Sequence, residues 1–200
     1  MNYKNFTPQE NEFFAENELI QIVPNFRESE FTFVSGTFGP FRPAKPVTVP
    51  LWLAIYLKQR NKCQVQVPLW LNHDYLTKVK AMERELDEVF SEDIPYYYFE
   101  MANLLFNHCA DEFQHLQKMK SIVEDIFELR KEKLVRVLKN IDSKAPVKYL
   151  SNVGAVELNS VRPAFQAAYN VAGQMQTIID NCEKSIEANA AAANNTNFGE

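Results

Sequence analysis

The chain has 200 residues, and its 21 Lys and Arg are outnumbered by 26 Asp and Glu, which gives a formal net charge of −5. Because Lys and Arg hold a phosphate backbone, this balance excludes strong, direct binding to duplex DNA. Hydrophobic residues make up 46% of the chain, enough for the core of one or two soluble domains. No apolar run reaches about 18 residues, so no membrane span is expected. The 3 Cys are widely spaced and indicate free thiols in a reducing compartment.

Residues 1–67 are predicted to form a small β-rich domain that starts with a short helix. The run Thr7-Pro8-Gln9-Glu10 has the pattern of a capping box with proline at the first helical position. It predicts a helix through about Glu18, with Phe13 and Phe14 facing inward. A domain this small has little core of its own and is expected to dock on the rest of the chain.

Strands are predicted where β-branched and aromatic residues gather. Leu19–Val23 and Glu30–Val34 have this composition, and Ser35-Gly36 marks a turn. Val47–Val49 lies among prolines, which favour an edge strand. The alternating run Cys63–Val67 predicts one more short strand.

A short helix from Val49 to about Asn61 is the most apolar stretch of the chain. Pro50 is expected at its first helical position, where no N–H is needed. Because apolar residues occupy nearly all sides of this helix, we expect it to be covered from several directions and to join the two parts of the chain.

The side chains of this stretch also include candidates for an interface. Trp52, Tyr56 and Trp70 have the spacing of core residues. Large aromatics near a joint between domains can also anchor an interface with a partner, so both roles stay open for all three. Lys58 and Arg60, together with Lys62, either balance the helix dipole or meet an acidic partner surface.

Residues 68–187 are predicted to form a helical bundle, and the Ala/Asn-rich residues 188–200 are predicted to be disordered. Four amphipathic helices are expected, with a linker at 141–156. The predicted helices cover 72–90, 96–109 and 111–139, and a last helix starts at Glu157. In the second helix, the residues predicted to face inward are Tyr97, Met101, Leu104, Leu105 and His108. In the last helix, the predicted apolar face consists of Phe165, Ala168, Tyr169, Ala172, Met175, Ile178 and Ile179.

Arg130 is the most informative charge in the helical part. It follows Val123 and Phe127 at helical spacing, so it falls on the apolar face of the longest predicted helix. One interpretation is that its aliphatic stem reaches water. The other is a bidentate ion pair with a carboxylate of a partner chain, since a buried guanidinium needs such a partner.

No motif in the sequence predicts catalysis or a metal site. It has no Gly-rich phosphate loop, no nucleophile elbow and no His-Glu-x-x-His pattern. His108 and His115 are two helical turns apart, about 10 Å, too far for one zinc ion, and Cys109 points away from His108. The sequence therefore predicts a protein without enzyme activity, metal or cofactor.

Several motifs, taken together, resemble one family. The sequence is similar to the GINS subunits of the second "partner of Sld-five" type, eukaryotic DNA replication factors, over roughly residues 11–170. The matching motifs are Pro50-Leu51-Trp52-Leu53-Ala54-Ile55, Leu57-Lys58-Gln59-Arg60, Lys62-Cys63, Ile22-Val23-Pro24-Asn25-Phe26, Phe38-Gly39-Pro40-Phe41, Pro68 with Trp70, Tyr96-Tyr97, Leu104-Leu105 with Asn107-His108, and Leu129-Arg130 with Lys133-Leu134.

This resemblance implies a β-rich B domain followed by a helical A domain, in a nuclear, non-catalytic scaffold subunit. It implies three sister GINS subunits as partners in a heterotetramer, and contacts through that complex with the MCM helicase ring and its RecJ-like cofactor. The alternative is an acidic helical, nucleic-acid-associated binding module of another replication or repair complex. The candidate interface residues are Trp52, Tyr56, Lys58, Arg60, Trp70, Phe127, Arg130, Lys133, Leu134 and Tyr169.

Overall fold

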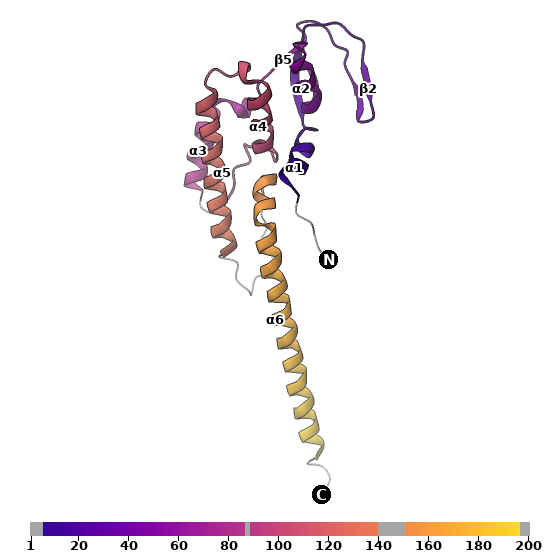
Figure 1. The fold of residues 1–200 in the computed structure, drawn as a ribbon. Helices are drawn as coiled ribbons and strands as arrows, with labels where there is room; N and C mark the ends of the chain where they lie inside the picture. Colours follow the sequence, from indigo (N-terminus) through magenta and orange to yellow (C-terminus); the bar gives the residue numbers. More distant parts are fainter. Residues whose placement is uncertain (1–5, 87–88, 140–150, 197–200) are drawn as a thin grey trace.

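The structure is a computed structural model and describes residues 6–86, 89–139 and 151–196. A β-rich part is followed by helices, and a long last helix extends away from the body (Figure 1). The predicted fold class, mainly α with a small β-rich module, is confirmed. The first part contains α1 (Pro8–Ala15), β1 (Leu19–Pro24), β2 (Phe31–Phe33), β3 (Gly36–Phe38), β4 (Val47–Pro50), α2 (Leu51–Gln59) and β5 (Cys63–Val65).

The predicted capping box begins α1. The Glu10 N–H donates to the Thr7 hydroxyl at 3.2 Å, and the Thr7 N–H donates to the Glu10 carboxylate at 2.7 Å. The prediction that Phe13 and Phe14 face inward is wrong, since they are 64% and 41% exposed. So short a helix buries only a narrow face, the side that carries Ala15.

Three antiparallel strands form a sheet in the order β4–β1–β5. The alternating pattern of β1 buries Ile20 and Ile22 on one face, as expected for a strand with one face on a core. Ile20 pairs with Val49 of β4, and Ile22 pairs with Val65 of β5. β4 therefore lies at an edge, as its proline-rich surroundings predict.

A second, two-stranded sheet is formed by β2 and β3, with Phe31 opposite Phe38. The sequence predicts the first of these strands but treats Ser35-Gly36 only as a turn. In the structure, β3 begins at Gly36, directly after the turn. Gly36 has a φ of 140°, a backbone conformation that other residues rarely adopt.

Helix α2 is buried on most of its surface, as its composition predicts. Leu51, Leu53 and Leu57 are each at most 5% exposed, and the helix contacts the three-stranded sheet as well as α4. Pro50 precedes the helix as its N-cap, one position earlier than predicted, because its ψ of 149° is extended.

The second part consists of helices around the longest body helix, α5. Its elements are the 3-10 turn η1 (Leu69–Leu71), α3 (His73–Glu85), α4 (Tyr98–His108), the 3-10 turn η2 (Ala110–Glu112), α5 (Leu116–Lys139) and α6 (Ala155–Thr196). Figure 1 shows α3 beside α5, with α4 between α5 and the β-rich part. Within the described ranges, no helix is long and apolar enough to cross a membrane.

The helix boundaries and faces differ from the predictions at several points. α3 ends at Glu85, so Phe90 lies outside it, and α5 begins at Leu116 rather than at residue 111. His108, predicted inward, is exposed: it shares a helix face with Leu104 and Leu105 but is the last residue of α4, where that face is no longer covered.

The main apolar core spans both parts of the chain. It includes Ala15 and Ile22 from the first part and Met101, Leu105 and Ile126 from the second. The contact between α2 and α4 connects the two halves of this core. The expectation that the β-rich part docks on the helices is therefore met through buried side chains.

The last helix, α6, continues through Thr196 and so passes the predicted boundary at residue 187. Its Ala-rich end has the composition with the highest helix propensity, which opposes the predicted disorder of this tail. Residues 197–200 and the side chains beyond Lys184 lie outside the described part, as does most of the predicted linker at 141–156.

Candidate interaction surfaces and a buried charge cluster

Four charged side chains from three helices meet inside the second part, a group that we call the charge cluster. It consists of Glu83 from α3, Arg130 and Lys133 from α5, and Glu157 from α6. Each residue is at most 2% exposed. Two carboxylates and two cations balance in charge, which is the condition for keeping ions out of water.

Arg130 is the centre of the cluster. Its Nε donates to Glu157 at 2.8 Å, and its two Nη groups donate to Glu83 and to the backbone carbonyl of Asn152. Lys133 pairs with the second oxygen of Glu83. Because guanidinium and carboxylate bonds are directional, this arrangement fixes α3, α5 and the start of α6 relative to one another.

The carboxylates of Glu83 and Glu157 also accept hydrogen bonds from neutral groups. The Tyr98 hydroxyl donates to Glu157 at 2.6 Å, and the Gly154 N–H donates to the other oxygen of Glu157 at 2.8 Å. The Ser91 N–H donates to Glu83 at 3.0 Å. Each carboxylate therefore accepts hydrogen bonds from neutral groups as well as from the cations.

The pKa of Arg130 shows how the cluster offsets burial. Burial alone lowers the pKa of this guanidinium, but Glu157 and Glu83 more than compensate, so its pKa is raised above the ordinary value. Burial, and then the neighbouring charge of Glu157, raise the pKa of Tyr98 well above its usual range. Both groups therefore hold their protons throughout the physiological pH range.

Arg130, Lys133 and Leu134 do not reach the surface of the chain, so their predicted role as partner-facing residues needs correction. Arg130 and Lys133 are 1% exposed, and Leu134 is 0% exposed. The prediction that Arg130 requires a carboxylate is correct, but the carboxylates come from this chain rather than from a partner. The alternative, a stem that reaches water, is also excluded.

Glu100 on α4 is a buried carboxylate outside the cluster. It is 8% exposed, and neither carboxylate oxygen has a hydrogen-bond partner among the described residues. Burial, and to a smaller extent the charge of Glu157, raise its pKa above the ordinary value. An ionised carboxylate in this position destabilises the fold.

Lys58, predicted either to balance the helix dipole or to meet a partner, forms ion pairs within the chain. Its Nζ lies 2.6 Å from Glu112 and 2.7 Å from Asp111. The same Glu112 carboxylate accepts the N–H of Val65 at 3.3 Å. These contacts connect α2 and β5 with η2, so Lys58 contributes to the joint between the two parts.

The aromatic candidates on α2 are placed differently from each other. Trp52 is partly buried and meets the ring of Phe33 edge to face, with ring centres 5.1 Å apart. Tyr56 is 47% exposed, and the guanidinium of Arg60 lies 4.2 Å from its ring centre. Tyr56 and Arg60 therefore remain surface candidates for an interface.

The remaining candidates lie on the helical part. Trp70 is partly buried against the main core. Phe127 is also partly buried, with its ring 4.7 Å from that of Phe99. Tyr169 belongs to α6, and its side chain lies outside the described residues.

A stripe of exposed apolar side chains follows the outer half of α6, and we call it the α6 stripe. Val171, Met175, Ile178 and Ile179 are 51%, 60%, 61% and 49% exposed. With about 100° between successive helical residues, they lie within roughly 100° of arc. Figure 1 shows this half of α6 extending beyond the other helices. The predicted apolar face is thus present here, and these four side chains are left exposed by the part of the chain that the structure describes.

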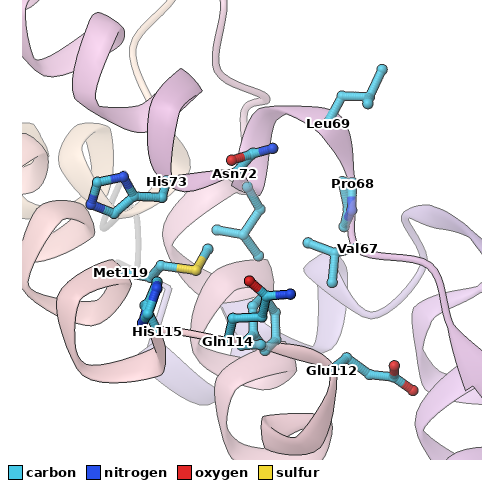
Figure 2. A pocket seen from close by; sticks show the side chains of 11 residues that line it. Val67, Pro68, Leu69, Asn72, His73, Glu112, Gln114, His115 and Met119 are labelled. Atoms are coloured by element: carbon cyan, nitrogen blue, oxygen red, sulfur yellow. The ribbon is translucent and has the colours of Figure 1, made fainter.

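A pocket of about 350 Å³ at the joint contains two of the histidines, His73 and His115. Figure 2 shows His115 beside Met119, with Glu112 at the far side of the view from His73. The Glu112 carboxylate forms an ion pair with Lys58. Among the residues that the structure describes, no three His, Cys, Asp or Glu side chains form a group suited to a metal ion.

The buried cysteines also lack the character of metal ligands or nucleophiles. Burial raises the pKa of both Cys63 and Cys109 to about 11. A thiol with this pKa stays protonated at neutral pH, whereas the thiolate is the reactive and metal-binding form.

Sequence reasoning missed the acidic half of the charge cluster. Glu83 stands in an acidic run that reads as a solvated surface, and Glu157 stands next to the predicted linker. A signal for Glu83 was present, since it lies four residues after the buried Val79, on the same helix face. No local signal connects Glu157 with Arg130.

Two segments of the chain match families of known proteins. Residues 7–66 match the PSF2 N-terminal domain family, and residues 70–176 match the family of GINS complex protein helical bundle domains.

Individual relatives agree with these family matches. The DNA replication complex GINS protein PSF2 of Xenopus laevis is 34% identical over 174 residues, covering 86% of this chain and 94% of the relative. The protein of that name from Schizosaccharomyces pombe is 38% identical over 161 residues, covering 80% and 86%. The human protein is 42% identical over 123 residues, covering 62% and 66%. The chain belongs to the PSF2 family of GINS complex proteins.

Proposed function

We propose that the chain is a non-catalytic structural subunit of the GINS heterotetramer, acting in the nucleus in DNA replication. The relatives are named as proteins of a DNA replication complex, and this supports the assignment. The finer part of the proposal is that the assembled complex serves the MCM helicase ring, together with a RecJ-like cofactor, as an accessory factor.

The observation that carries the proposal is the α6 stripe. An apolar stripe of this length is unfavourable in water, and contiguous exposed apolar surface in a soluble protein indicates an interaction site. The helix that bears it is fixed at its start by Glu157 and Arg130, so the stripe is presented in a defined direction. We therefore assign the stripe to contacts with sister GINS subunits.

The test is co-expression with the three sister subunits, followed by determination of mass and stoichiometry. The unchanged chain should give a 1:1:1:1 complex, whereas the chain alone should aggregate. The double variant Met175→Glu and Ile178→Glu places two charges in the stripe and should abolish recovery of the complex.

A matched control carries the same two charges on the opposite side of the same helix. Asn170→Glu and Thr177→Glu are both at exposed positions, about 200° around the helix from Met175. This control should assemble normally. Equal recovery of the complex with both double variants would contradict the proposed role of the stripe, and a soluble lone monomer that ignores the sister subunits would contradict the proposed function.

A further inference from the structure

A second surface, far from the α6 stripe along the chain, lies between α2 and the β2–β3 hairpin. Figure 1 shows β2 beside α2. A groove of about 700 Å³ runs between them, and its walls include Phe31, Phe33, Trp52 and Tyr56. This volume falls within the range of about 300–1,000 Å³ typical of ligand-binding clefts.

The floor and walls of the groove are built by aromatic contacts. Phe31 packs on Phe41 at 4.8 Å between ring centres, and Phe41 is fully buried. Phe33 meets Trp52 edge to face and remains 40% exposed. The hairpin is thus anchored at its base, while its upper rings stay available to an apolar side chain from outside.

The rim of the groove is basic, in contrast to the net charge of −5 for the whole chain. Arg27, Arg60 and Lys62 line it, together with one carboxylate, Glu28. All three cations are exposed, and none forms an ion pair with any residue that the structure describes. Lys58, two residues before Arg60, differs because it forms ion pairs with Asp111 and Glu112.

We propose that this groove binds an acidic peptide segment of a partner protein, with one large apolar side chain inserted between the aromatic walls. The carboxylates of the peptide would lie against Arg27, Arg60 and Lys62, because unpaired cations around an apolar centre give charge complementarity with such a segment. This mode combines an anchor in a pocket with a charged rim, as in many peptide-recognition grooves.

The geometry favours a peptide over single-stranded nucleic acid. Nucleobases stack on open ring faces, and grooves for them follow the backbone with many cations. Here Phe33 meets Trp52 by its edge, and Arg60 covers the face of Tyr56. Three cations next to a carboxylate are too few to hold a nucleic acid chain at cellular salt.

The experiment measures binding of fluorescent peptides to the full chain, in the assembly in which it is recovered. The probes are short synthetic peptides with a central Phe, Leu or Trp flanked by Asp and Glu. Counterparts have Lys in place of the acidic residues, and a third probe is single-stranded oligothymidylate. We expect binding of the acidic peptides alone, weakening as salt is added.

Charge reversal at the rim tests the location. The variant Arg60→Glu with Lys62→Glu should weaken acidic-peptide binding about tenfold or more. Arg84→Glu with Lys118→Glu makes the same charge change at exposed sites on α3 and α5, and should stay within about twofold of the unchanged chain. Phe33→Ala, which changes no charge, should also weaken binding. Circular dichroism melts confirm that each variant is folded.

Three outcomes would overturn the proposal. No binding of any acidic peptide at millimolar concentration would remove it, and so would equal weakening by the rim variant and its control. Binding of oligothymidylate that is lost in the rim variant would assign the groove to nucleic acid instead. Because the Met175→Glu and Ile178→Glu variant leaves the groove unchanged, it should still bind the peptides, which separates this proposal from assembly through α6.

Discussion

The two ends of α6 belong to one helix and are stabilised in opposite ways. At its start, Glu157 is fully buried and accepts bonds from Arg130, Tyr98 and Gly154. In its outer half, Met175 is 60% exposed on the apolar stripe. The start of the helix finds its partners within the chain, whereas the outer half carries apolar side chains that no described residue covers.

This difference shows that the orientation of α6 and the stickiness of its apolar surface have separate physical origins. Ion pairs and hydrogen bonds depend on angle as well as distance, so a buried network selects one orientation for the helix that enters it. Apolar contact is nearly independent of direction and follows the area removed from water. The charge cluster therefore sets where α6 points, and in the proposed complex the stripe would supply the affinity for a sister subunit.

The largest effect is expected from breaking the charge cluster with Arg130→Met. The change leaves Glu83 and Glu157 in the interior with fewer cationic partners, and loss of one partner of a buried ion pair costs about 3–5 kcal/mol. The measurement is the free energy of unfolding in urea. The Met175→Glu and Ile178→Glu variant is the suitable background, because it should keep the lone chain soluble.

Arg84→Met is the matched control for Arg130→Met, because Arg84 is exposed on α3. It should change the free energy of unfolding by less than about 0.5 kcal/mol. A loss below 1 kcal/mol for Arg130→Met would show that the start of α6 is not fixed by the cluster, and the contrast between the two ends would then fail.

The same substitution at two glycines sharpens the contrast. A Cβ at Gly154 would lie 2.9 Å from the Tyr98 ring, whereas one at Gly173 would meet nothing within 4 Å. Gly154→Ala should therefore destabilise the chain by about 1–3 kcal/mol through overpacking. Gly173→Ala should stabilise α6 by up to about 1 kcal/mol, since glycine is a poor helix former. Thermal melts of both variants would test the opposite signs.

A smaller effect, dependent on pH, is expected at Glu100, which lies within electrostatic range of Glu157. Its folded-state pKa is raised above the ordinary value of 4.5, so the folded chain binds this proton more tightly than the unfolded chain. The stability that this provides is present at low pH and is lost as the pH rises through the raised pKa.

Glu100→Gln cannot ionise and tests that sign. Variant and unchanged chain should be equally stable below pH 4.5, and the variant should become the more stable one as the pH rises, until the difference levels off above the raised pKa. Urea unfolding across a pH series, with both proteins in the soluble Met175→Glu and Ile178→Glu background, measures this. A difference that is constant with pH would show that Glu100 keeps an ordinary pKa.

The smallest loss of stability is expected on removing Lys58, whose ion pairs are partly exposed to water. The Lys58 side chain is 11% exposed, but that of Asp111 is 69% exposed. Lys58→Met should cost less than about 1 kcal/mol, and the loss should shrink in high salt. The cost of Arg130→Met should vary little with salt, since water and ions do not reach the cluster. Equal salt dependence for both would remove the distinction between them.

Local signals predicted much of the fold. The capping box at Thr7, the alternation of β1 and the apolar run of α2 each depend on neighbours within a few residues, and the structure confirms these elements. The wrong assignments come from the positions of neighbouring elements. Phe13 faces water because α1 is covered on one narrow side only, and no pattern within eight residues reports which side that is.

The candidate sites were less predictable for the same reason. A guanidinium on an apolar helix face requires a carboxylate, and Arg130 met this expectation. Its partners lie 47 and 27 residues away in the sequence, so periodicity cannot identify them. For the other candidates, the interface role stays a prediction: Trp52, Tyr56, Lys58, Arg60, Trp70, Phe127 and Tyr169.

The shared core has a consequence for exchange between relatives. Two segments of the sequence match separate families, but Leu53 and Leu57 of the first share a core with Leu104 and Leu105 of the second. A chimera that joins residues 1–66 of one species to the remainder of another would place unmatched volumes against each other on α2 and α4. Grafts that carry α4 along with the first segment should tolerate the exchange, and grafts cut between the matched segments should melt at lower temperature.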